Sequence, residues 1–161
     1  MPSKPSSTPS PARQVATFLG KFDPSVEKLL RACRAVLRKR LPTAVEMVYD
    51  NYNFFVIGYC STPRASDCIV SLTGSSNGAG LCFTHGAKLP DPDGLLFGSG
   101  KQTRFLRLPE AAVLKTPGVE ALLKTAIARA ITPLPSSGKG PTVIRSISAK
   151  QRPRRRNAAR A

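Results

Sequence analysis

The sequence contains no tryptophan, a single histidine and only 9 acidic residues among its 161. Aromatic residues make up 6% of the chain and apolar residues 41%, so the predicted core is mainly aliphatic. No apolar run approaches the ~20 residues of a membrane-spanning helix, and residues 1–10 lack the apolar segment of a secretory signal. We therefore expect a cytoplasmic protein without a membrane partner.

The sequence also lacks the Cys-x-x-Cys pairs and His clusters that hold most metals. The four cysteines are Cys33, Cys60, Cys68 and Cys82. Three of them fall inside apolar runs, where cysteine usually behaves as a small buried hydrophobe. His85 follows Cys82 by three residues, and on a strand the two side chains would face opposite sides. We expect reduced thiols, no catalytic pair, no metal and no cofactor.

Positive charge dominates, with a formal net charge of +16, and it is unevenly distributed. Residues 1–22 carry three bases and no acid, residues 23–132 carry 14 bases and all 9 acids, and residues 133–161 carry eight bases and no acid. The last segment is rich in Pro, Ser, Gly and Arg and is predicted to be a disordered basic tail. It either solubilises the chain or binds nucleic acid without sequence preference. The candidate nucleic-acid contacts are Arg152, Arg154, Arg155 and Arg156.

Hydrophobic periodicity predicts helices before and after a set of short strands. Ser10-Pro11 and Asp23-Pro24 are helix starts, Gly20 is expected to end the first helix in the left-handed conformation, and Asn77-Gly78 predicts a hairpin. The expected helices are 11–19, 24–41 and 117–132, and the expected strands are 45–49, 53–60, 68–72, 81–84 and 104–108.

This order predicts an α+β fold with two layers, in which an antiparallel meander sheet of about five strands carries helices on one face. Leu30, Leu37, Leu123 and Ile127 should be nearly inaccessible to solvent. The expected organisation is a disordered leader (1–11), one domain (12–132) and the basic tail (133–161).

Two loop motifs have structural explanations. The segment from Gly98 to Lys101 lacks the spacing of a phosphate-binding P-loop and leads into a strand, so it predicts a tight turn with a solvated lysine. Asp91 and Asp93 alternate with prolines and are expected to form turns.

The polar corner between the first two strands is the strongest candidate site. Hydroxyl, carboxylate and amide groups gather there, and approach of basic residues from the last strand would create a site for a small polar or anionic ligand. The alternative is a structural corner in which Asp50 pairs with Arg104 or Arg107. The candidate residues are Tyr49, Asp50, Tyr52, Asn53, Lys101, Arg104 and Arg107.

Three segments resemble the family called domain of unknown function 1801. They are Glu46 to Asn53 with Val56 to Tyr59, His85 to Leu96, and the Gly98-Ser-Gly-Lys-Gln-Thr-Arg104 segment with the strand after it. The resemblance covers about residues 12–132. It implies a compact α+β domain of the YdhG-like superfamily, with a frataxin-like fold and no settled enzymatic activity.

Part of that superfamily is described as an iron chaperone, which implies an acidic face on the first long helix. Here the corresponding helix has Asp23 and Glu27 at its start and six bases after them, and these would repel a divalent cation. The favoured function is a small, non-catalytic binding module for a polar or anionic ligand. The rivals are nucleic-acid association through the tail, an enzyme using the polar corner and, least favoured, iron delivery.

Overall fold

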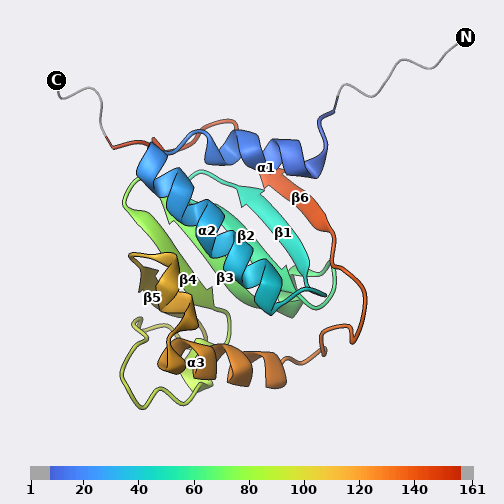
Figure 1. Ribbon diagram of the computed structural model, residues 1–161, viewed down its shortest axis with the longest axis vertical. Coiled ribbons are helices and arrows are strands. Elements are labelled where there is room, and N and C mark those ends of the chain that lie inside the picture. Colours follow the sequence, from blue (N-terminus) through green and yellow to red (C-terminus); the bar gives the residue numbers. More distant parts are fainter. Residues whose placement is uncertain (1–7, 157–161) are drawn as a thin grey trace, which may run out of the picture.

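The computed structural model describes residues 8–156, which form three α-helices on a six-stranded sheet (Figure 1). The α-helices are α1 (Pro11–Leu19), α2 (Pro24–Arg40) and α3 (Pro117–Ala128). The strands are β1 (Val45–Asp50), β2 (Phe55–Cys60), β3 (Cys68–Ser75), β4 (Gly78–Phe83), β5 (Arg104–Leu108) and β6 (Thr142–Ile147). Short 3₁₀-helices are η1 (Ala65–Asp67), η2 (Gly86–Lys88) and η3 (Ala111–Lys115). Residues 1–7 of the expected leader lie outside the described part.

The strand order is β5-β4-β3-β2-β1-β6. The first five strands form the expected antiparallel meander, and β6 adds to the far side of β1 in parallel. The α+β prediction is confirmed, but the strand count is six rather than five and the sheet is mixed. The added strand lies in the segment expected to be a disordered tail, so that prediction is wrong for residues 142–147.

Local sequence explains most of the element boundaries. The Ser10 hydroxyl accepts the N–H of Arg13 and Pro11 opens α1, and prolines open α2 and α3 as well. Gly20 ends α1 with φ −63°, in the right-handed region, so the expected left-handed exit is wrong. In the β3–β4 hairpin, Ser75 pairs with Gly78, whose φ of 124° is the positive value that the turn requires.

The main core lies between the helices and one face of the sheet. Because side chains alternate along a strand, one row of register partners, Val48, Ile57, Leu72, Leu81 and Leu106, points toward the helices, whose own buried residues join the same cluster. Helices on one face are therefore confirmed.

Three of the four burial predictions are confirmed, because Leu30, Leu37 and Leu123 are at most 1% exposed. Ile127 is only half-buried. The reason is that α3 ends at Ala128, four residues before the predicted end, and Ile131 beyond it is 83% exposed.

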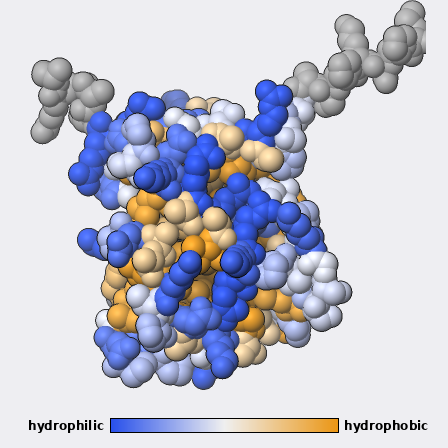
Figure 2. Space-filling model, in the orientation of Figure 1, coloured by the Kyte–Doolittle hydropathy of each residue, from blue (hydrophilic) through white to orange (hydrophobic). Residues whose placement is uncertain are grey.

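Hydrophilic residues cover much of the helix side of the molecule, in a band that follows α2 and at the upper end near α1 (Figure 2). Apolar residues show between these groups. Among residues 8–156, no helix is both long and apolar enough to cross a membrane.

Candidate ligand-binding site

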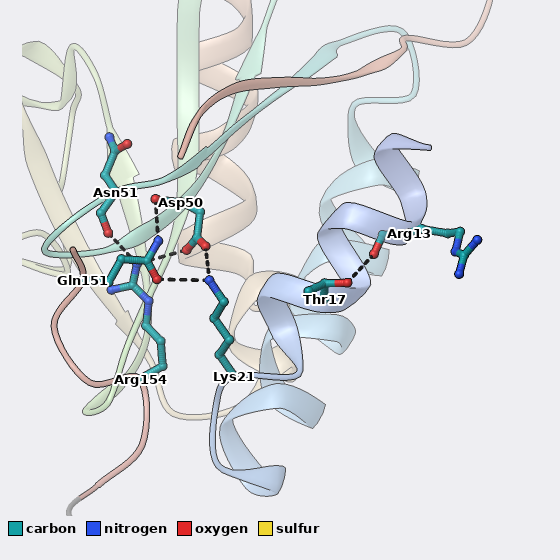
Figure 3. Close-up of polar contacts among 7 residues, drawn as sticks. All are labelled: Arg13, Thr17, Lys21, Asp50, Asn51, Gln151 and Arg154. Atoms are coloured by element: carbon teal, nitrogen blue, oxygen red, sulfur yellow. Dashed lines mark hydrogen bonds and ion pairs between the residues drawn. The ribbon is translucent and has the colours of Figure 1, made fainter. Parts of the chain in front are cut away.

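Asp50 ends β1 and is completely buried, with its carboxylate held by two cations of the chain itself (Figure 3). The Lys21 ammonium donates to Oδ2 at 2.7 Å and Arg154 Nη2 donates to Oδ1 at 3.0 Å. Burial alone would raise the pKa of this carboxyl group, but hydrogen bonds to Lys21, Gln151 and Arg154 outweigh that effect and lower it. Asp50 is therefore structural, and its partners are Lys21 and Arg154 instead of the expected Arg104 or Arg107.

The rest of the predicted corner does not assemble with the β5 cations. Three strands separate β1 from β5 in the sheet. Tyr49 is half-buried in a small cluster on the helix-free face, whereas Tyr52 and Asn53 are exposed in the turn that follows. The single site that combined this corner with Lys101, Arg104 and Arg107 is therefore wrong.

The β5 cations have contacts of their own. Arg104 Nη1 donates to the carbonyls of Gly100 and Thr103. The guanidinium of Arg107 lies 5.7 Å from the Phe97 ring centre.

The four candidate arginines of the tail divide into one buried residue and three exposed residues. Arg154 is only 4% exposed and paired with Asp50, so it cannot contact nucleic acid in this fold. Arg152 lies over the exposed Tyr52 ring, with 5.7 Å between the guanidinium carbon and the ring centre. Arg155 donates to the carbonyls that follow α1, and the Arg156 N–H donates to the Asp23 carboxylate. Nucleic-acid binding through the exposed three stays a prediction.

The described surface includes two hollows that bring predicted residues together. The wider one, of about 980 Å³, brings together Arg107 and Arg156, which were predicted as members of different sites, beside Phe54 and the β3–β4 turn. It is an open groove. The narrower one, of about 490 Å³, is the α3 pocket, which lies between the end of α3, the start of β3, the end of β4 and the loops after β4.

Apolar side chains form much of the wall of the α3 pocket, and basic side chains surround them. The apolar lining residues are Ile69, Phe83, Leu89, Ala126, Ala130 and Ile131. The basic and imidazole lining residues are His85, Lys88, Lys101 and Arg129. All four of these are exposed. The Arg129 guanidinium donates to the Lys88 carbonyl at 2.8 Å and so ties the end of α3 to the loop that carries the lysine.

Asp67 is the one acidic residue that lines the α3 pocket in the described structure, and the protein satisfies it internally. The Thr62 hydroxyl donates to Oδ2 at 2.6 Å and the Thr132 hydroxyl donates to Oδ1 at 3.0 Å. These bonds, that of Thr62 first, lower the pKa of the Asp67 carboxyl group. The two hydroxyl donors thus stabilise the charged form of Asp67 without a cation, and the cations around the pocket keep no direct carboxylate partner in the described residues.

Sequence reasoning missed this pocket because its walls come from four separate segments of the chain. It treated His85 as a structural residue and Lys101 as a solvated turn residue, without connecting them. The signal that could have joined them is a pair of glycine-containing loops that each end in a lysine, His85-Gly-Ala-Lys88 after β4 and Gly98-Ser-Gly-Lys101 before β5. The end of β4 pairs with the start of β5, so both loops lie at the same end of this strand pair.

The remaining predicted features have plain roles. Asp91 accepts the N–H groups of Leu95 and Leu96 at 2.8 and 2.9 Å, so its expected role as a turn former is confirmed. Within the described residues, no three His, Cys, Asp or Glu side chains gather as a metal site would require.

A second buried carboxylate, Glu46, lies at the other end of β1 and is 3% exposed. Arg34 donates to both of its oxygens, and the hydroxyls of Tyr59 and Thr142 donate at 3.0 and 2.8 Å. Burial raises the pKa of Glu46, but hydrogen bonds and charge from Arg34 outweigh that effect and lower it. Glu46 is therefore also structural.

Comparison with known proteins adds no relative, because no family model, curated protein or solved structure matches the chain. The resemblance to the domain of unknown function 1801 family stays a prediction.

Proposed function

We propose that this protein is a non-catalytic binding module that holds a small anion with an apolar body in the α3 pocket. The observation that supports the proposal is the distribution of charge around that pocket. Its wall is largely apolar, Lys88, Lys101 and Arg129 line it, and its carboxylate, Asp67, is already held by two threonine hydroxyls. An apolar surface with a few convergent polar groups is the usual composition of a small-molecule site.

The dimensions limit the ligand to a small molecule. A volume of about 490 Å³ falls within the range of roughly 300–1,000 Å³ that is typical of ligand pockets. The apolar part of the ligand would lie against Ile69, Phe83 and Leu89, and its carboxylate or phosphate group would lie near the lysines. Lys88 and Lys101 are on separate loops, so they can approach one anionic group from two sides.

The test measures binding of defined probes to the full chain. Octanoate and phenyl phosphate are the anionic probes, 1-octanol is the neutral probe, and inorganic phosphate has no apolar body. We expect the first two to raise the melting temperature and to give saturable heats in calorimetry. The neutral alcohol and inorganic phosphate should bind more weakly, because each satisfies only half of the pocket.

Matched variants locate the site. Lys88→Gln combined with Lys101→Gln should weaken octanoate binding about tenfold, since two partly exposed ionic contacts contribute about 0.7 kcal/mol each. The control combines Lys115→Gln with Lys124→Gln, which removes the same charge from exposed positions outside the pocket. Equal weakening in both double variants would show that only net charge matters. If neither octanoate nor phenyl phosphate binds, the proposal is refuted.

A further inference from the structure

The helix-free face of the sheet carries three of the four cysteines. Cys60 ends β2 and Cys68 begins β3, and the two are register partners in this antiparallel pair, at a point where the register shifts. Directly opposed residues of antiparallel strands have Cα atoms about 4.5–5.5 Å apart. That separation lies within the span of about 4.4–6.8 Å that disulfides bridge.

The two sulfur atoms flank one small space. A Cβ atom placed on Gly58 would lie 3.2 Å from Cys68 Sγ and 3.6 Å from Cys60 Sγ, so both sulfur atoms lie next to the same glycine. Because Gly58 has no side chain, nothing from that position separates them. Cys68 Sγ also lies 3.3 Å from the Ser71 hydroxyl oxygen. The strands thus hold a pair of thiols side by side, and both are reduced in this structure.

The members of the pair differ in accessibility and in charge. Cys60 is 1% exposed, whereas Cys68 is half-buried. A hydrogen bond from Cys60 comes first among the effects that lower the pKa of Cys68 to about 6, and bonds from Ser71 and Thr84 add to it against the opposing effect of burial. The pKa of Cys60 is raised. The less buried residue of the pair is therefore the thiolate, and the fully buried one keeps its proton.

We propose that Cys60 and Cys68 form a reactive dithiol that a peroxide oxidises to a reversible cross-strand disulfide. The Cys68 thiolate attacks one peroxide oxygen, the O–O bond breaks and hydroxide leaves, so that Cys68 becomes a sulfenic acid. Cys60 sulfur then attacks Cys68 sulfur and gives up its proton, and water leaves as the S–S bond forms. The peroxide is reduced and the two thiols are oxidised. A small dithiol returns both cysteines to the thiol state by exchange.

The other two cysteines are internal controls. Cys33 is completely buried among the core residues of α2, and burial raises its pKa to about 11. Cys82 is half-buried on the same face as Cys68, but burial and the nearby Cys68 raise its pKa to about 11. Accessibility alone therefore does not distinguish Cys68 from Cys82, and the difference lies in the hydrogen bonds around the sulfur.

The experiment treats the reduced full chain with equimolar hydrogen peroxide and maps disulfides by peptide mass spectrometry after alkylation. We expect two of the four thiols to be lost, one intramolecular link between Cys60 and Cys68, and full recovery with dithiothreitol. Before oxidation, iodoacetamide at neutral pH should modify Cys68 at least about ten times faster than Cys82. Retention of all four thiols, a link through Cys82, or links between chains alone would overturn the proposal.

Variants separate the two chemical steps. Cys60→Ala should stop the reaction at a Cys68 sulfenic acid that dimedone traps, whereas Cys82→Ser should form the disulfide as the parent does. Cys68→Ser should form neither product. A sulfenic acid at Cys82 or Cys33 in the Cys60→Ala variant would show that Cys68 is not the attacking sulfur. Since the mapping of the parent chain needs no substitution, poor folding of a variant leaves the test intact.

Discussion

The two buried carboxylates of β1 face the same side of the sheet but are held by different parts of the chain. Glu46 draws its charged partners from α2, with Arg34 only 12 residues away in sequence. Asp50 draws one cation, Lys21, from the turn after α1 and the other from Arg154, 104 residues away. Glu46 also accepts from Thr142. The Glu46 end of β1 is therefore held mainly by α2, which is close to it in sequence. The Asp50 end depends in part on Arg154, which lies beyond the predicted domain.

Deletion of residues 141–161 should have the largest effect on this arrangement. It removes β6, which leaves the outer edge of β1 unpaired, and it removes one hydrogen-bond donor from each carboxylate. We expect a loss of unfolding free energy larger than that of any single substitution, or failure to fold, measured by urea denaturation with circular dichroism. A truncated chain with the midpoint of the full chain would support the sequence-based view that this segment is a disordered appendage.

Single substitutions sharpen the comparison between the two ends. Arg154→Ala should cost about 3 kcal/mol or more, because it leaves the fully buried Asp50 with one partly exposed cation. Arg34→Ala should cost less, about 2 kcal/mol, because Arg38, Tyr59 and Thr142 remain around Glu46. Arg155→Ala is the control, since that exposed side chain contacts only carbonyls. A larger cost for Arg34→Ala would reverse the comparison.

The pH dependence of stability is a more gradual effect. Both carboxyl groups have folded-state pKa values below their ordinary values of 3.8 for Asp50 and 4.5 for Glu46. Their stabilising contributions are therefore complete above those values and are lost as the pH falls through the lower folded-state values. Urea midpoints should be level near neutral pH and fall below about pH 4. Asp50→Asn and Glu46→Gln should each flatten that fall, and an unchanged slope in both would contradict the assignment.

Sequence patterns predicted the first five strands and the helix starts, because these depend on neighbouring residues. Ser10-Pro11 sets the start of α1 within one turn. The spacing of Val45, Met47 and Tyr49 by two residues places them on one face of β1, where they belong to the same small cluster. Even the short β3–β4 connection was readable from Asn77-Gly78.

The features that escaped prediction depend on partners far away in sequence. The Thr142–Ile147 segment has only three apolar residues between Pro141 and the arginine-rich end, and it becomes a strand because β1 offers it hydrogen-bonding groups. Arg154 looked like its charged neighbours, and only the position of Asp50 makes it a buried residue. The α3 pocket likewise has no local signature, because each of its cations would be an ordinary surface residue elsewhere.

The parallel pairing of β6 with β1 also constrains the order in which the molecule can be assembled. During synthesis β1 leaves the ribosome well before its outer neighbour, since 96 residues separate Glu46 from Thr142. Contacts that close so long a loop form late and slow folding. Until then the β1 edge is open to strands of other chains, which is a route to aggregation. The nascent chain therefore exposes the outer edge of β1 until β6 has emerged and can pair with it.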